Sequence, residues 1–197
     1  MSEKYKFDTM SLHSGHVPDK ETGSRAVPIY QTTSYVFKDT DEAAALYNME
    51  VGGHLYTRIS NPTIATLEQR LASLDGGVSC VACSSGMAAM HLVVTAICSS
   101  GDHIVASNKM YGANINLLQH TMTRFGIETT FVNPNNLEEI EKAIKPNTKL
   151  VFGEVIGNPG LDVMNVPEVA KICKKKNVPL AIDATFNTCL LYTSDAA

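Results

Sequence analysis

The residue best placed to do chemistry is an aspartate, Asp183, which ends the apolar run Val-Pro-Leu-Ala-Ile at 178–182. A short apolar run with β-branched residues between helical patterns is typical of a buried strand in a parallel sheet. The carboxyl ends of such strands form the edge where ligands bind. Because a carboxylate in apolar surroundings is costly unless a cation faces it, we expect Asp183 to meet a cationic group.

A second candidate is Ser85-Gly86-Met87, which joins an expected strand near 79–83 to an expected helix near 86–98. Backbone N–H groups are free at a helix N-terminus and bind phosphate well. Taken alone, the segment fits a plain turn with a serine cap at least as well. It has neither the lysine of a P-loop nor the spaced glycines of a dinucleotide fingerprint.

Tyr56 and Arg58 come just before a second expected helix, ahead of a Ser-Asn-Pro turn at 60–62. The planar guanidinium group of an arginine suits a phosphate dianion. The ordinary alternative is a solvated arginine on the surface.

Two further candidates follow expected strands. Tyr111, followed by Gly112, comes after the strand expected at 103–107 and offers a face on which a flat ligand stacks; the alternative is an aromatic lid on the core. Asn158 lies in the turn Gly-Asn-Pro-Gly, where its amide either hydrogen-bonds a ligand oxygen or only nucleates the turn.

Together these strand ends would bring a phosphate site, an aromatic ring, an amide and a carboxylate to one edge of a sheet. A planar, phosphorylated ring with a protonated nitrogen satisfies all four, and we therefore expect pyridoxal 5′-phosphate. Asp183 would keep the ring nitrogen protonated so that the ring absorbs electrons from a substrate. A dinucleotide-binding domain would need a spaced-glycine turn that the sequence lacks.

The elements that position these residues alternate regularly from residue 61 onward, which predicts an α/β domain with a mostly parallel sheet and helices on both faces. Asn61-Pro62 begins the first helix. Strands are expected near 79–83, 103–107, 127–132, 150–155 and 178–182, with helices near 63–74, 86–98, 112–125, 137–144 and 167–176. Residues 1–60 lack sustained periodicity beyond a short helix near 41–47, and we expect an extended arm that packs on a neighbouring subunit.

The composition excludes several classes of protein. With 44% hydrophobic and 18% charged residues it is typical of a globular protein, and no apolar stretch approaches the ~20 residues of a membrane span. The net charge of −4 argues against nucleic-acid binding. The N-terminus lacks the apolar segment of a signal peptide, so we expect a cytoplasmic protein.

The five cysteines, at positions 80, 83, 98, 173 and 189, are an odd set within apolar segments. This pattern favours reduced core thiols over disulfides. Cys80 and Cys83 form a Cys-x-x-Cys pair, but no second ligand pair follows at metal-binding spacing, and we expect no metal site.

The chain resembles the N-terminal half of the Cys/Met-metabolism enzymes, a pyridoxal-phosphate-dependent family with an aspartate-aminotransferase-like fold (fold type I). The resemblance runs from about residue 7 to residue 188. It is carried by the segments 23–35, 56–63, 85–89, 111–112 and 183–186.

This resemblance implies a role for each candidate residue. It implies that Ser85, Gly86 and Met87 bind the phosphate, that Tyr111 stacks on the ring, and that Asn158 binds the ring hydroxyl. It also implies that Asp183 pairs with the ring nitrogen and that Tyr56 and Arg58 bind the phosphate held by a neighbouring subunit. It also implies a homotetramer built as a dimer of dimers.

Within the family, residues 23–35 and the turn 156–161 are most similar to the sulfhydrylases that act on O-acetylhomoserine. The implied reaction replaces acetate by sulfide or a thiol and forms homocysteine for methionine biosynthesis, with Tyr111 and Asp183 as catalytic residues. The nearest alternative, methionine γ-lyase, typically has cysteine where this chain has Ala113. A cystathionine γ-synthase-like activity is the other alternative.

In this family the lysine that forms a Schiff base with the cofactor lies roughly two dozen residues beyond the position of Asp183. No lysine follows Lys176 here, and residues 189–197 depart from the family pattern. We therefore expect 61–188 to be an incomplete cofactor-binding domain, 189–197 to be a foreign tail, the C-terminal domain to be absent and the chain alone to be inactive. A short non-catalytic module that binds a phosphate ligand is the alternative of another class, although it would retain a costly carboxylate.

Overall fold

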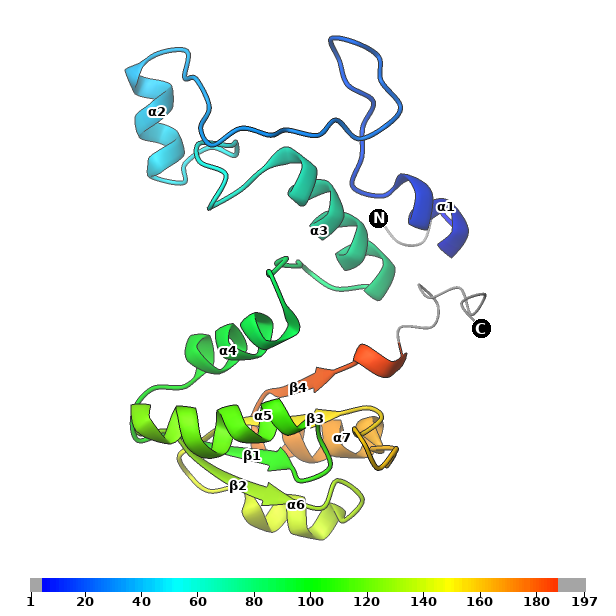
Figure 1. The fold of residues 1–197 in the computed structure, drawn as a ribbon, viewed down its shortest axis with the longest axis vertical. Helices are drawn as coiled ribbons and strands as arrows, with labels where there is room; N and C mark the ends of the chain where they lie inside the picture. Colours follow the sequence, from blue (N-terminus) through cyan, green and yellow to red (C-terminus); the bar gives the residue numbers. More distant parts are fainter. Residues whose placement is uncertain (1–4, 188–197) are drawn as a thin grey trace. The chain divides into compact units, whose positions relative to one another are not determined.

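The computed structural model describes residues 5–187 (Figure 1). The chain divides between Ala82 and Cys83 into two compact units. The foreign tail predicted at 189–197, with Cys189, lies outside the described residues.

The unit that begins at Cys83 is built on a four-stranded sheet in which every neighbouring pair is parallel. The strand order is β2-β1-β3-β4. Consecutive parallel strands need helical crossovers, and each strand here is preceded by a helical segment. The strands are β1 (His103–Ser107), β2 (Glu128–Val132), β3 (Thr148–Glu154) and β4 (Leu180–Asp183).

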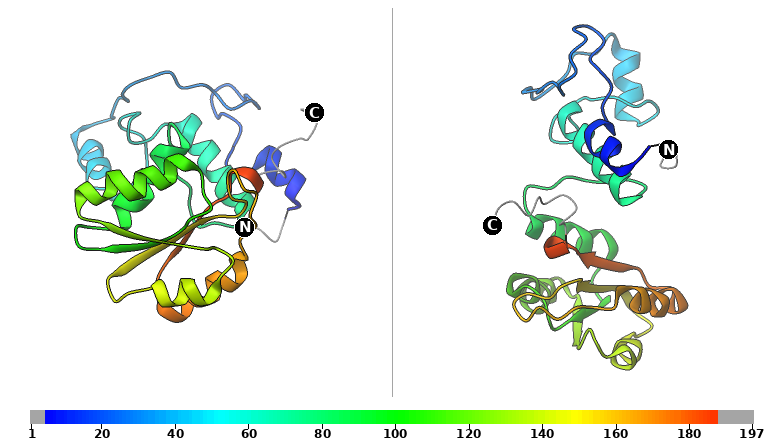
Figure 2. Two further views of the ribbon diagram at one scale, coloured as in Figure 1. Left: turned by 60° about the horizontal axis from the view of Figure 1, so that its bottom comes forward. Right: turned by 90° about the vertical axis from the view of Figure 1, so that its right-hand side faces the viewer.

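Helices cover both faces of this sheet (Figure 2, left). On one face, Ile104 and Leu150 pack with Met90 of α4 (Gly86–Ile97) and Leu118 of the helical segment that starts with α5 (Gly112–Asn116). On the other face, Val105 and Val151 pack against α6 (Leu137–Ala143) and α7 (Val166–Lys176). The predicted fold class, a mostly parallel α/β sheet with helices on both faces, is confirmed.

The helix predicted over 112–125 is helical throughout but changes form along its length. α5 continues into a π-helical turn, Leu117–Thr121, and then a 3-10 turn, Met122–Phe125. Gly126 ends the segment with φ of 75°, a left-handed conformation that glycine adopts without strain.

The strand predicted near 79–83 is wrong, because the structure shows no strand over these residues. A strand forms only where a neighbouring backbone pairs with it, and the N–H of Ala82 instead donates to the Glu68 carboxylate at 2.8 Å. Val78 and Val81 are exposed. Likewise β4, expected to be fully buried, is half-buried at the edge of the described sheet.

The unit that ends at Ala82 contains three helices within the described residues. The short helix predicted near 41–47 is present as α2, the helix predicted at 63–74 is present as α3, and α1 was not predicted. Asn61 caps α3, as expected, by accepting from the N–H of Thr63 at 2.9 Å. The bounds are α1 (Phe7–His13), α2 (Thr40–Tyr47) and α3 (Pro62–Asp75).

This N-terminal unit buries very little of itself. Among residues 5–82, Asn61 is the only one that is fully buried, and Val36, Ile29 and Ile59 are 100%, 79% and 70% exposed. Folded proteins normally bury most residues of this kind. That residues 1–60 form an arm on a neighbouring subunit stays a prediction.

Two of the cysteines lie in the cores of the sheet-containing unit. Cys98 and Cys173 are buried, and burial together with nearby Asp102 raises the pKa of the Cys98 thiol to about 11. That thiol is therefore protonated at neutral pH. Within residues 5–187 no group of three or more His, Cys, Asp or Glu side chains could hold a metal ion, and no helix is long and apolar enough to cross a membrane.

Candidate functional site

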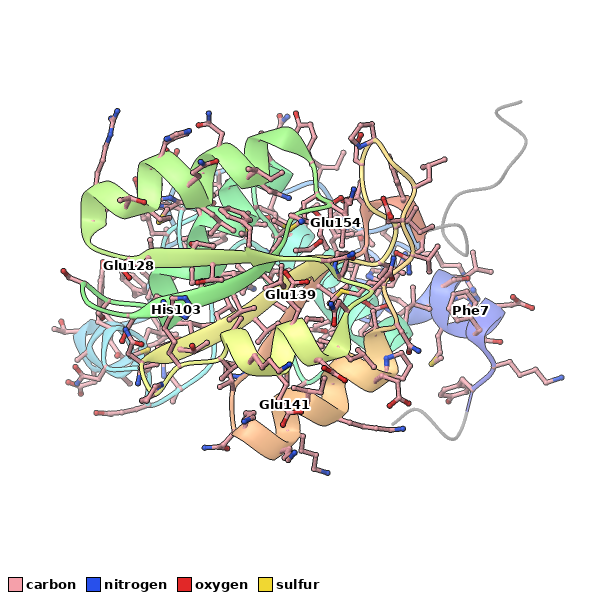
Figure 3. The ribbon with its side chains drawn as sticks, turned by 90° about the horizontal axis from the view of Figure 1, so that it is seen from below. Phe7, His103, Glu128, Glu139, Glu141 and Glu154 are labelled. Carbon is pink, nitrogen blue, oxygen red and sulfur yellow. The ribbon has the colours of Figure 1, made fainter. Side chains whose placement is uncertain are left out.

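The candidate site lies at the carboxyl ends of β1, β3 and β4, which meet at one edge because the strands are parallel. Glu154 ends β3 and stands in register with Asp183, which ends β4. Figure 3 shows Glu154 at the opposite end of the sheet from His103, which begins β1. The loops that leave this edge carry Tyr111 and Asn158, as the strand pattern predicted.

The carboxylate of Asp183 is held by two neighbours. One oxygen, Oδ1, accepts from the backbone N–H and the hydroxyl of Thr185, at 2.9 and 2.5 Å. The other, Oδ2, lies 3.4 Å from the amide nitrogen of Asn114. In the described part of the chain no lysine or arginine forms a salt bridge with Asp183. The carboxylate thus remains a fitting partner for a cationic ligand.

The carboxylate of Glu154 is the centre of the hydrogen-bonding network at this edge. It is 6% exposed. Oε1 accepts from the backbone N–H of Tyr111 at 2.7 Å and from the amide of Asn114 at 3.2 Å, and Oε2 accepts from the backbone N–H of Asn158 at 3.1 Å. One buried carboxylate therefore holds both loops of the site.

Sequence reasoning missed Glu154 and Asn114 as functional residues. The signal that singled out Asp183, a carboxylate closing an apolar run, is equally present at Glu154, which follows Leu-Val-Phe-Gly at 150–153. Asn114 follows Tyr111 by one helical turn, a spacing that gives no signal of its own.

The loops that carry Tyr111 and Asn158 approach each other closely. A Cβ added to Gly157 would lie 2.3 Å from the backbone oxygen of Lys109, so a side chain cannot be accommodated there without movement. Tyr111 is 49% exposed, and Asn158 is half-buried. An exposed aromatic face beside a fixed turn leaves room for a flat ligand.

The third part of the site is the start of α4, a helix of 12 residues. Ser85 is its N-cap, and the Ser85 hydroxyl accepts from the N–H of Ala88 at 3.1 Å. Ser85 therefore caps the helix, as expected for a plain turn with a serine cap. A Cβ at Gly86 would meet nothing within 4 Å, and Met87 lines a hollow of about 500 Å³. The first-turn N–H groups of such a helix attract an anion.

Tyr56 and Arg58 belong to the N-terminal unit, in a turn tied to the preceding segment. Tyr56 bridges Ser34 in antiparallel fashion, and the N–H of Thr57 donates to the carbonyl of Thr33 at 2.8 Å. The side chains of Tyr56 and Arg58 are both exposed. An arginine held in this way by its backbone remains able to bind a phosphate from another molecule.

Comparison with proteins of known sequence gives close relatives. The chain is 45% identical over 185 residues to the O-acetyl-L-homoserine sulfhydrylase of Leptospira meyeri, a match that covers 94% of this chain and 42% of that protein. It is 42% identical over 191 residues to the O-acetyl-L-homoserine sulfhydrylase of Corynebacterium glutamicum, covering 96% of this chain and 44% of that protein. The chain thus spans less than half the length of these relatives.

Solved structures agree with the sequence relatives. A crystal structure described as an O-acetylhomoserine (thiol)-lyase of Campylobacter jejuni carries N′-pyridoxyl-lysine-5′-monophosphate at position 205. It superposes with a TM-score of 0.89 at 38% identity, over 92% of this chain and 44% of that chain. The model of the Cys/Met metabolism PLP-dependent enzyme family matches residues 8–194. The chain therefore belongs to the pyridoxal-phosphate-dependent Cys/Met metabolism enzyme family.

Proposed function

We propose that the protein binds pyridoxal 5′-phosphate at this edge of the sheet and replaces the acetate of O-acetylhomoserine with sulfide. The observation that carries the proposal is that Glu154 binds the backbone of Tyr111 and of Asn158 and is linked through Asn114 to Asp183. Met87, at the start of α4, and Gly112, next to Tyr111, line one hollow. The choice of substrate is supported by the names of the relatives.

The groups present fit the cofactor by their chemistry. An anionic phosphate needs N–H donors, and the start of α4 with Ser85, Gly86 and Met87 offers them in an open position. A protonated pyridine nitrogen needs a carboxylate, which Asp183 supplies. The Tyr111 ring would stack on the cofactor, and Asn158 would bind its ring hydroxyl.

When bound, pyridoxal phosphate would supply an electron sink for the reaction. Asp183 keeps the proton on the ring nitrogen, because its carboxylate stabilises the charged form. The hydroxyl of Tyr111 moves a proton near the substrate. In the overall reaction the Cγ–O bond breaks, acetate leaves, sulfide forms the Cγ–S bond, and homocysteine results.

We further propose that the protein acts as a cytoplasmic homo-oligomer, a dimer of dimers. In such an assembly Tyr56 and Arg58 would reach the phosphate held by a neighbouring subunit. The support is the N-terminal unit, which exposes Val36, Ile29 and Ile59 and has a single buried residue within 5–82. A unit that buries so few of its side chains gains stability when a partner covers them.

The test uses the protein expressed from its complete reading frame and purified with pyridoxal phosphate. We expect a visible cofactor absorbance band, and equal yields of homocysteine and acetate from O-acetylhomoserine and sulfide. Asp183→Asn should retain the fold but lose most of the turnover, because a neutral amide no longer stabilises the ring proton.

Three results would contradict the proposal. The first is absence of the cofactor band, and the second is wild-type turnover in Asp183→Asn. The third is formation of 2-oxobutyrate from methionine at a higher rate than homocysteine formation, which would make the protein a γ-lyase.

A further inference from the structure

We propose that Glu154 is a positioning residue whose buried charge sets the geometry of the cofactor site. This inference rests on the proposed function, because the residues that Glu154 holds are those assigned to the cofactor. It goes beyond that function by naming what fixes the relative positions of the stacking tyrosine, the ring-hydroxyl asparagine and the ring-nitrogen aspartate.

The side chain of Glu154 accepts hydrogen bonds from three residues. Three donors converge on Glu154: the backbone N–H groups of Tyr111 and Asn158 and the side-chain amide of Asn114, at 2.7, 3.1 and 3.2 Å. An ionised carboxylate is an acceptor only, so it satisfies all three at once. Hydrogen bonds to an ionised group are the stronger kind, and a 6% exposed carboxylate is shielded from competing water.

Asn114 links two carboxylates, those of Glu154 and Asp183. Its side chain is buried, with 2% exposure, and its amide nitrogen lies 3.2 Å from Glu154 Oε1 and 3.4 Å from Asp183 Oδ2. Glu154 and Asp183 are register partners on adjacent strands, so both side chains leave the same face of the sheet. An amide NH₂ has two hydrogens and serves one carboxylate with each. The orientation of Asp183 is thereby tied to that of Glu154.

A neutral isostere cannot replace the carboxylate of Glu154. A glutamine at position 154 would present one oxygen and one NH₂ group. With three donors converging, its NH₂ must face at least one other N–H, which leaves a buried donor without an acceptor. That donor belongs to the Tyr111 loop, the Asn158 turn or the Asn114 link, so at least one cofactor group loses its support.

The experiment compares variants of the protein expressed from its complete reading frame. Glu154→Gln removes the charge with minimal change of shape. Glu128→Gln is the matched control, because Glu128 is an exposed glutamate in β2 at the far end of the sheet (Figure 3). Asn114→Ala cuts the link to Asp183 and leaves the Glu154 charge in place. The readouts are the dissociation constant for pyridoxal phosphate, the visible circular dichroism of the bound cofactor, and the melting temperature of the cofactor-free protein.

We expect Glu154→Gln to bind the cofactor roughly tenfold more weakly, since an unsatisfied buried donor costs about that factor, and to lose cofactor dichroism. Glu128→Gln should match the wild type. Asn114→Ala should alter the dichroism more than the affinity, because the phosphate contacts are unchanged. If Glu154→Gln does not fold, the cofactor dichroism of Asn114→Ala tests the positioning role in its place.

The outcomes separate the inference from the proposed function. If the wild type binds the cofactor and Glu154→Gln binds it with equal affinity and dichroism, the positioning role is refuted and the proposed function stands. A lower melting temperature without a change in affinity or dichroism would also refute it, since it would show a purely structural residue. If the wild type binds no cofactor, both fail.

Discussion

Replacing Thr148 with valine should destabilise the sheet-containing unit through the buried His103. Thr148 begins β3 and is 5% exposed, and its hydroxyl hydrogen-bonds Nδ1 of His103 at 2.8 Å. The same hydroxyl accepts from the backbone N–H of Lys145 at 2.8 Å, while Nε2 of His103 bonds the hydroxyl of Thr130 at 2.8 Å. Both ring nitrogens of the buried His103 are therefore bonded to threonine hydroxyls.

The magnitude follows from the groups that lose a partner. Valine keeps the shape of threonine but cannot hydrogen-bond, so Nδ1 of the fully buried His103 loses its partner and the N–H of Lys145 loses its acceptor. A buried polar group left unsatisfied costs about 1–3 kcal/mol. Because Lys145 lies in an exposed turn where water can replace the hydroxyl, we expect a total of about 2 kcal/mol.

The assay is urea denaturation of the complete protein, followed by circular dichroism, with Thr148→Val and the wild type compared at pH 7.5. Thr123→Val is the matched control, because Thr123 is exposed and its hydroxyl bonds only a helix carbonyl, at 2.9 Å. The control should change stability by less than ~0.5 kcal/mol. The reasoning is refuted if Thr148→Val is no less stable than Thr123→Val.

Three further predictions concern other parts of the molecule. Burial, helped by a nearby lysine, lowers the pKa of His103, so the native state favours the neutral ring. The stability of the protein should therefore fall as the pH drops below about 6.5, by at most about 1.4 kcal/mol per pH unit. A pH series that is equally steep in His103→Gln would contradict this. Gly157→Ala should weaken pyridoxal phosphate binding and lower the free energy of unfolding by about 1–3 kcal/mol, since its Cβ would lie 2.3 Å from a backbone oxygen. Gly160→Ala should have neither effect, because its Cβ would meet only a flexible side chain. Equal effects of the two variants on melting temperature and cofactor affinity would contradict this prediction. Asn61→Ala should lower the stability of the N-terminal unit by about 2 kcal/mol and expose residues 28–34 to hydrogen exchange. The reason is that this buried amide caps α3 and also donates to the carbonyl of residue 30. Asn136→Ala, which removes an exposed helix cap, should leave that segment protected.

Much of the fold could be predicted because its signals are local. Asn61-Pro62 and Ser85 begin helices through hydrogen bonds to residues within three positions, which the sequence displays directly. Apolar runs bounded by turn residues likewise marked β1, β2, β3 and β4. Because parallel strands share one carboxyl edge, the same runs predicted that Tyr111, Asn158 and Asp183 would gather there.

The strand expected at 79–83 failed for a reason that no local pattern contains. A strand is stabilised by its neighbour, and within the described residues the Ala82 N–H bonds a side-chain carboxylate instead of a neighbouring strand. The helix at 112–125 was predicted in extent but not in form, because no local pattern distinguishes its π-helical and 3-10 turns from an α-helix. Leu118 and Met122 in these turns are buried in the core against the sheet.

By itself, therefore, the sequence determined the alternation of strands and helices, the helix caps and the edge on which the candidate residues lie. Only the tertiary structure decided how those residues are held together. Glu154 reaches Tyr111 across 43 positions of sequence, and Asn114 reaches Asp183 across 69. The partners of a buried carboxylate are chosen by which loops the folded sheet brings within hydrogen-bonding distance, and that choice has no periodicity or spacing along the chain.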